Sequence, residues 1–197
     1  MTAAVKWNLV SVEDYLSGEL VSSVRHEYLG GVVHAMAGAR VVHNDITSNV
    51  HLAVGSRLRG KPCRVYSSDM KIRIRRDDQV TFYYPDLSVI CRSNPATDLF
   101  QDEPAVIFEV LSKATRRIDT GEKKDAYLTI PSLQVYAVVE QDSPLIIVFR
   151  RSGKKFEREV HSGLDASISL AEIGVDLPLA EVYDRVEFTP EPDNDAG

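Results

Sequence analysis

Two carboxylates of this sequence stand in apolar surroundings, where charged side chains are rare. Glu109 lies inside the run AVIFEVL of residues 105–111, and Asp86 begins the run DLSVIC of residues 86–91. A charged carboxylate in such a place costs several kcal/mol unless it is protonated, paired with a cation or bound to a metal. If the two runs are neighbouring strands, the carboxylates meet near one sheet edge. A hard divalent cation with oxygen ligands, most plausibly Mg²⁺, would relieve their repulsion there.

Each acid also has an ordinary structural interpretation. Asp86 could bond to nearby backbone at the start of a strand, and Glu109 could pair with an arginine. A third acid, Glu27, alternates with its neighbours in the segment VRHEYL of residues 24–29. For Glu27 alone, the favoured interpretation is a cross-strand partner for a surface cation. The residues by themselves leave the metal site and these structural roles open.

A lysine would complete the chemistry of phosphodiester cleavage, because a cation orients the attacking water and stabilises the negative charge of the transition state. Lys123 shares one face of a predicted helix with Asp119 and Tyr127, at four-residue spacing. The alternative for Lys123 is an ion pair on a solvated helix. Lys113 is nearer to Glu109 in the sequence, but we expect the strand to end before it.

Several other kinds of site lack their sequence signatures. The histidines show no metal-binding spacing, and no dinucleotide, Walker or nucleophile-elbow motif is present. Cys63 and Cys91 sit in apolar company, and we expect buried thiols in a reducing cytoplasm rather than a disulfide. The longest apolar runs are about five residues, whereas spanning a bilayer takes about 20. We therefore expect no membrane segment, and a cytoplasmic protein.

The charge is unevenly distributed along the chain. The formal net charge is −6, yet residues 57–76 hold eight basic side chains and a single acid. We call residues 57–76 the basic block. Polyanions respond to local charge, so this block is a candidate for nucleic-acid contact, with a plain solvated surface as the equal alternative. The expected DNA-contacting residues are Arg57, Arg59, Lys71, Arg73 and Arg75.

The elements that must hold these residues alternate between helical and extended patterns. Strict alternation over residues 70–75 predicts a half-buried strand with a basic face, and the Gly30-Gly31 pair predicts a hairpin turn. Apolar side chains every four residues from Ile46 to Leu58 predict a long helix, capped by Asn44 or Asp45. The other expected elements are a short helix from Ser11 to about Ser17, strands at 85–91 and 105–111, a helix at about 120–129, and strands at 135–139, 145–150 and 156–160.

This pattern predicts a mixed α/β or α+β domain, with an antiparallel meander toward the C-terminus. The length of 197 residues, with 44% hydrophobic and 26% charged side chains, fits one globular domain. We expect residues 1–188 to form that domain and the acidic residues 189–197 to be a loose tail.

Taken together, an ordered series of short motifs resembles a known family. The series spans about residues 11–152 and resembles the Uma-type family of restriction endonucleases, within the PD-(D/E)XK nuclease superfamily. Its main stretches are Arg25-His26-Glu27-Tyr28-Leu29, His43-Asn44, Ser68-Asp69-Met70-Lys71, Tyr84-Pro85-Asp86, Glu109-Val110-Leu111-Ser112, Gly121-Glu122-Lys123 and Ile130-Pro131-Ser132-Leu133.

The resemblance implies a restriction-endonuclease-like core, a mixed central sheet flanked by helices. It implies Asp86 and Glu109 as ligands of Mg²⁺ or Mn²⁺, Lys123 as the catalytic lysine and Glu27 as a further acid of the site. Leu111 departs from the superfamily pattern, since the motif lysine stands at that position. The family similarly carries its lysine on the following helix.

We therefore expect a metal-dependent DNA endonuclease, with a homodimer among its expected assemblies. The alternative is a nuclease-like fold that has lost catalysis and only binds nucleic acid or a protein. The displaced lysine and the negative net charge favour this alternative. The presence of costly acids at Asp86 and Glu109, together with Lys123, disfavours it.

Overall fold

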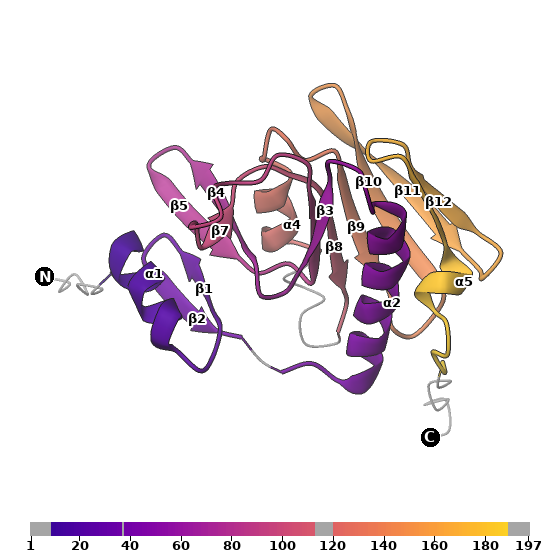
Figure 1. The fold of residues 1–197 in the computed structure, drawn as a ribbon, viewed down its shortest axis with the longest axis horizontal. Coiled ribbons are helices and arrows are strands. Elements are labelled where there is room, and N and C mark those ends of the chain that lie inside the picture. The colour runs from indigo at the N-terminus through magenta and orange to yellow at the C-terminus, as the bar shows by residue number, and fades with distance from the viewer. Residues whose placement is uncertain (1–8, 37, 113–119, 189–197) are drawn as a thin grey trace, which may run out of the picture.

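The fold is known from a computed structural model, which describes residues 9–36, 38–112 and 120–188. A six-stranded sheet forms the centre of the molecule (Figure 1). Its β8 and β9 run parallel and every other neighbouring pair is antiparallel, so the predicted mixed sheet is confirmed. In spatial order its strands are β11 (Lys155–Ser162), β10 (Leu145–Ser152), β9 (Val135–Val139), β8 (Pro104–Val110), β6 (Leu87–Ile90) and β3 (Arg64–Ser67).

A second sheet of five strands lies to one side of the first (Figure 1). Helix α1 (Val12–Val21) packs on it through Tyr15, whose ring centroid lies 5.0 Å from that of Tyr28 and 5.3 Å from that of Phe82. Burial of these aromatic rings holds the N-terminal segment against the sheet. In spatial order the strands are β2 (Val32–Ala35), β1 (His26–Leu29), β5 (Gln79–Tyr83), β4 (Lys71–Arg76) and β7 (Phe100–Gln101).

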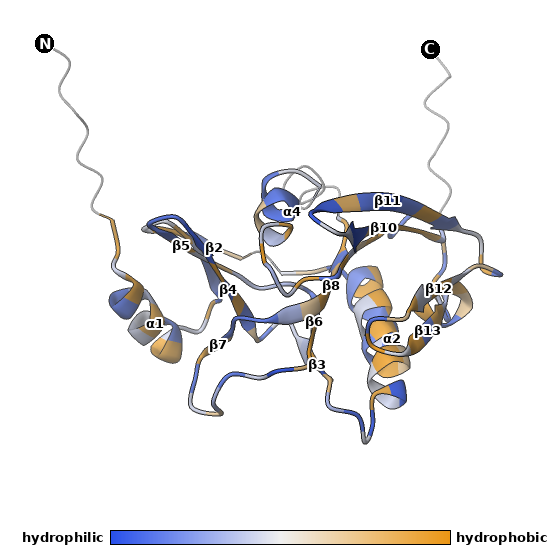
Figure 2. Ribbon diagram, turned by 90° about the horizontal axis from the view of Figure 1, so that it is seen from above, coloured by the Kyte–Doolittle hydropathy of each residue, from blue (hydrophilic) through white to orange (hydrophobic). Residues whose placement is uncertain are grey.

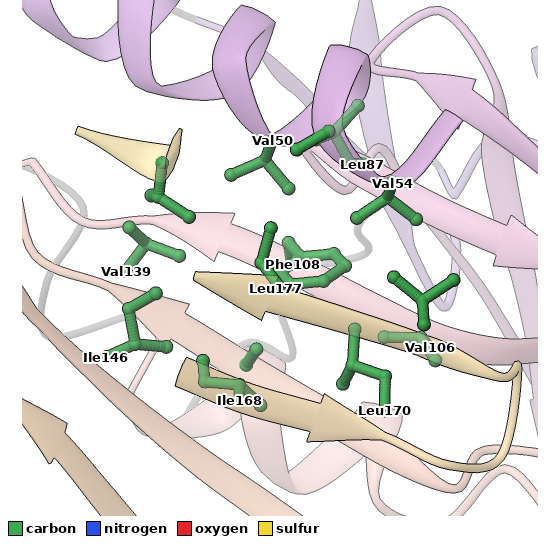
Figure 3. Packing of buried hydrophobic residues seen from close by; sticks show 14 of the residues in the cluster. Val50, Val54, Leu87, Val106, Phe108, Val139, Ile146, Ile168, Leu170 and Leu177 are labelled. Atoms are coloured by element: carbon green, nitrogen blue, oxygen red, sulfur yellow. The ribbon is translucent and has the colours of Figure 1, made fainter. Parts of the chain in front are cut away.

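Two helices cover opposite faces of the six-stranded sheet (Figure 2). Helix α2 (Val41–Arg57) buries the four-residue series Ile46, Val50 and Val54, and Figure 3 shows Val50 and Val54 over Phe108. Each such fully buried side chain contributes about 1.5–3 kcal/mol. The hairpin of β12 (Ser167–Leu170) and β13 (Val175–Pro178), followed by the short α5 (Leu179–Val182), completes this core. Helix α4 (Glu122–Tyr127) covers the other face.

The predicted helices exist, but two of their ends differ from expectation. Ser11 caps α1 as predicted, accepting the Asp14 N–H at 3.0 Å, yet the helix continues past Gly18 to Val21. Helix α2 begins at Val41, before the expected Asn44 or Asp45 cap. Its anchoring against the sheet supports an early start even without a side-chain cap, because tertiary packing provides most helix stability in proteins.

The two cysteines correct another expectation, since Cys63 and Cys91 form a disulfide instead of buried thiols. Strands β3 and β6 are antiparallel, with Arg64 paired to Ile90. The next residues along this register are the two cysteines, whose Cα atoms lie 3.8 Å apart. The two cysteines are 28 residues apart in the sequence, and no local sequence pattern indicated that they would pair.

No helix in the described part of the chain has both the length and the apolar character needed to cross a membrane. The expected acidic tail, residues 189–197, lies outside the described residues. The expected domain boundary at residue 188 stays a prediction.

Candidate active site

The acids Asp86 and Glu109 lie side by side at the end of the β6–β8 ladder. Leu87 pairs with Phe108, so continuing that register by one residue sets Asp86 opposite Glu109. Each carboxylate accepts a hydrogen bond from backbone at the other position: the Asp86 N–H donates to Glu109 Oε2 at 3.3 Å, and the Val110 N–H donates to Asp86 Oδ2 at 2.7 Å. These reciprocal bonds fix both carboxylates to the same sheet.

Lys123 reaches the same place from helix α4. Its Nζ lies 3.0 Å from Glu109 Oε1 and 3.1 Å from Glu27 Oε1, and it donates to the Tyr84 carbonyl oxygen at 3.4 Å. The side chains of Lys123, Glu109 and Glu27 are 7%, 3% and 17% exposed. Buried charges persist only when they are paired and hydrogen-bonded, and this lysine with its two carboxylates meets that condition. We call Glu27, Asp86, Glu109 and Lys123 the acid–lysine cluster.

The acid–lysine cluster sits where the chain passes from one sheet to the other. Glu27 belongs to β1 of the five-stranded sheet, and β1 pairs with β5. The residues Tyr84, Pro85 and Asp86 then connect β5 to β6 of the six-stranded sheet. The cluster therefore takes one residue each from β1, β8 and α4, and one from the connection between β5 and β6.

Tyrosine side chains line the buried side of the acid–lysine cluster. Tyr127 is fully buried, and burial together with the negative charges of Glu109 and Glu27 raises its pKa well above the usual value. Burial also raises the pKa of Tyr83 to about 12. Both phenols therefore stay protonated at neutral pH, so neither can act as a general base there.

His43 also reaches the site, and sequence reasoning missed it. Its ring, on the first turn of α2, places Nε2 at 3.2 Å from Asp86 Oδ2. The sequence assigned it no role, because the spacing of the histidines fits no metal site. Two signals were available: the His43-Asn44 stretch of the family resemblance, and the position of His43 at the start of a helix that packs on the strands bearing the acids.

Asp86 and Glu109 are the carboxylates of the acid–lysine cluster that could bind a metal ion. The described residues hold no group of three or more His, Cys, Asp or Glu side chains arranged for a metal ion. Mg²⁺ commonly takes only one or two protein carboxylates and keeps several waters, so Asp86 and Glu109 fit it. A structural zinc site needs about four protein ligands and does not fit.

Part of the basic block is paired with carboxylates of the same chain. Arg57 donates to both carboxylate oxygens of Glu181 at 2.7 and 2.6 Å. Arg73 does the same with Asp102 at 2.7 Å for each bond. The sequence had placed both on a surface free to grip phosphates, but their carboxylate partners lie 124 and 29 residues away.

Lys71 departs most from the expected basic face. The strict alternation put it on the solvent side of its strand with Arg73 and Arg75, yet Lys71 is 5% exposed. Its Nζ donates to the Leu99 carbonyl oxygen at 3.1 Å and lies 5.1 Å from the Tyr84 ring centroid. Burial lowers its pKa. Strand β7 pairs with β4 at Lys71 and Phe100, and the residue before Phe100 supplies the carbonyl that the Lys71 ammonium binds.

The remaining two expected DNA contacts are exposed. Arg59 and Arg75 both lie at the surface. Arg59 lines a pocket of about 660 Å³ beside the end of α2, together with Lys61 and Arg64. Lys113, the other lysine weighed for catalysis, lies outside the described residues.

Comparisons with known proteins point to one family. Residues 12–180 match the model of the Uma2 family, described as "Putative restriction endonuclease". The chain is 29% identical over 181 residues to the uncharacterized protein slr1290 of Synechocystis, covering 91% of this chain and 94% of that protein. It is 28% identical over 144 residues to a second uncharacterized Synechocystis protein, sll1609, covering 72% and 80%.

A solved structure shares the fold. The crystal structure described as "a putative nuclease belonging to DUF820", from Anabaena variabilis, superposes with a TM-score of 0.69. The match covers 88% of this chain and 97% of the other, at 17% sequence identity. At this identity the match establishes a shared fold, in agreement with the expected nuclease-like core.

Proposed function

The chain belongs to the Uma2 family, and from that membership we propose that it is a metal-dependent endonuclease that hydrolyses phosphodiester bonds of DNA. One observation carries the proposal: a lysine ammonium lies within 3.1 Å of two carboxylates that face it from two different sheets. A surface ion pair would not need one buried and one largely buried acid around one cation. A hydrolytic centre does, because it must hold both a cation site and a charged proton donor or orienter.

The three acids of the cluster have different proposed roles. Asp86 and Glu109 would hold Mg²⁺ or Mn²⁺, which supplies positive charge against the negative charge that develops on the phosphoryl group. Glu27 lies on the other sheet and contacts Lys123 at 3.1 Å. We assign Glu27 the task of holding the lysine in place.

Lys123 orients the attacking water or the phosphate oxygen. Its Nζ contacts the carboxylates of Glu109 and Glu27 and the carbonyl oxygen of Tyr84, which is the most distant of these three oxygens at 3.4 Å. A hydrogen bond of this length is weak. A substrate oxygen can therefore take the place of this carbonyl while both carboxylates keep the ammonium charged.

The DNA backbone would run over the exposed part of the basic block. Arg59 and Arg75 are the members of our predicted set that are exposed. Contacts of this kind carry affinity and little sequence information.

Cleavage of supercoiled plasmid in Mg²⁺ or Mn²⁺ tests the proposal. Lys123→Met should lower the rate by roughly 10² or more, as expected for removal of one electrostatic stabiliser. Lys124→Met is the matched control, because Lys124 lies on the same helix but packs near the Phe149 ring and should keep full activity. Asp86→Asn serves as a second inactive variant, since the amide oxygen can still accept the Val110 N–H and preserve the fold.

Two results would contradict the proposal. Equal cleavage by wild type, Lys123→Met and Asp86→Asn would assign the activity to a contaminant. A folded wild type that binds DNA but cuts none, in either metal, would favour the binding-only alternative.

A further inference from the structure

A hydrogen bond and an ion-pair contact converge on a single oxygen of Asp86. Oδ2 accepts the Val110 N–H at 2.7 Å and lies 3.2 Å from His43 Nε2. Among the described residues, Oδ1 of Asp86 has no such hydrogen bond or ion pair. The Asp86 side chain is 18% exposed, so this second oxygen can be reached from outside. The carboxylate is thus held by one oxygen and open at the other.

We propose that His43 is a positioning residue, which holds Asp86 so that Oδ1 is the oxygen available to a divalent cation. This inference rests on the proposed function and names a residue that nothing in the family match or the relatives assigns. Ligating carboxylates are themselves commonly hydrogen-bonded, and removing such outer partners typically costs 10–100-fold in metal affinity.

The position of His43 suits this task. Helix α2 is anchored beside it by Ile46, which is fully buried, so the ring projects from a rigid element. The His43 side chain is itself 14% exposed, which restricts its motion. Nε2 can donate to Oδ2 in the imidazolium form and in the neutral tautomer that is protonated at Nε2.

The Val110 N–H cannot orient Asp86 alone. A single bond from one strand fixes one oxygen but leaves the carboxylate free to turn about it. The second contact, from His43 on α2, restricts that freedom from a different element. Groups held from two rigid elements keep the geometry that a metal site demands.

The experiment measures Mn²⁺ affinity by calorimetry, without substrate and without reference to cleavage. His43→Ala should bind Mn²⁺ 10–100-fold more weakly than wild type. His43→Gln should recover most of the affinity, because its side-chain amide can donate from near the position of Nε2. His51→Ala is the matched control: His51 is an exposed histidine two turns further along α2, and its loss should leave Mn²⁺ affinity unchanged.

A cycle with Asp86 separates positioning from a general effect on the fold. In an Asp86→Ala background, His43→Ala should cause no further loss of Mn²⁺ affinity, because the group it positions is gone. Thermal melting without metal identifies any variant that fails to fold, and His43→Leu, which fills similar space without a polar donor, then serves in place of His43→Ala.

The outcomes distinguish this inference from the proposed function. Unchanged Mn²⁺ affinity in folded His43→Ala would overturn the role of His43 while leaving the nuclease proposal standing. A plasmid assay at saturating Mn²⁺ adds a second test, since a positioning residue predicts restored cleavage in His43→Ala. Persistent loss there would make His43 a direct participant and overturn the positioning role. Absence of Mn²⁺ binding in wild type would overturn both.

Discussion

The acid–lysine cluster and the basic block were both recognised by charge, and they differ in how that charge is used. In the cluster, charged groups from separate elements meet each other and are buried together. In the basic block, cations that look alike in sequence have separate fates. Arg57 and Arg73 are bound by distant acids, Lys71 is buried, and Arg59 and Arg75 face solvent.

The difference shows what a count of charges measures. Eight cations in twenty residues overstate the free positive charge, because tertiary contacts bring acids to some of them. For acids in apolar runs, a count of charges understates their importance, because burial makes each charge dependent on its partner. Variants that remove one charge at a time should therefore have large effects in the cluster and graded effects in the block.

The largest effect on stability is expected at Lys123. Lys123→Ala leaves Glu27 and Glu109 buried without their cation, which should lower the free energy of unfolding by about 3–5 kcal/mol. Urea unfolding without metal measures it. Lys123→Met combined with Glu27→Gln and Glu109→Gln should recover much of this loss, since no buried charge remains unpaired. If the single variant is as stable as wild type, the ion contacts do not hold the site together.

Arg73 should give the next largest effect, although it belongs to the basic block. It bonds both oxygens of a partly buried Asp102 and lies 4.0 Å from the Phe100 ring centroid. Arg73→Ala should cost about 1.5–3 kcal/mol of unfolding free energy, the range for hydrogen bonds to charged groups. Arg75→Ala, two residues along the same strand, is the control and should cost less than about 0.5 kcal/mol. Equal losses would mean that the Asp102 pairing contributes nothing.

DNA binding should depend on the exposed arginines of the basic block more than on the arginines that are paired with acids. Replacing Arg59 and Arg75 together by Ala should lower the slope of log K against log salt by about two units, because about one counterion is released per phosphate contact. Replacing Arg57 and Arg73 together should change the slope little, since their charges are already paired. Fluorescence anisotropy across a salt series measures both. Equal slope changes would show that DNA displaces the internal acids.

The smallest effect concerns the pair of Arg57 and Glu181. The hydrogen bonds from Arg57 lower the pKa of Glu181, although partial burial opposes the shift. A lowered carboxylate pKa stabilises the fold above the unfolded value of about 4.3, and this stabilisation is lost as pH falls through the folded pKa.

Both side chains of this pair are substantially exposed, so the contribution should stay below about 1 kcal/mol. Melting temperatures of wild type and Glu181→Gln should therefore differ slightly at pH about 6 and converge toward pH about 3. A difference that grows on acidification would contradict the assignment.

The sequence predicted the elements of the cluster better than its contacts. Asp86 and Glu109 stood out because an acid in an apolar run has few explanations, and the two strands are indeed neighbours. Lys123 came from the family resemblance, since helical spacing alone favoured an ordinary ion pair on a solvated helix. Its contact with Glu27 joins residues 96 positions apart, and no local pattern encodes a contact set by how two sheets meet.

The same reason explains the incorrect expectations. The Cys63–Cys91 disulfide depends on which strand pairs with β3 and in which register. The burial of Lys71 depends on β7, a two-residue strand that alternation could not predict. Periodicity reports one face of one element, whereas these features require the neighbour of that face to be known.

The position of the acid–lysine cluster between two sheets has a mechanical consequence. Asp86 and Glu109 are tied by backbone bonds of one ladder, so they move together as one stiff unit. The contact of Lys123 with Glu27 reaches into the other sheet, and it is an ion pair between two side chains. A small shear between the sheets would stretch the lysine contact while leaving the paired acids unstrained. The site thus combines a rigid part, the Asp86 and Glu109 pair, with a compliant part, the contact of Lys123 with Glu27. A relative movement of the two sheets would change the lysine contact first.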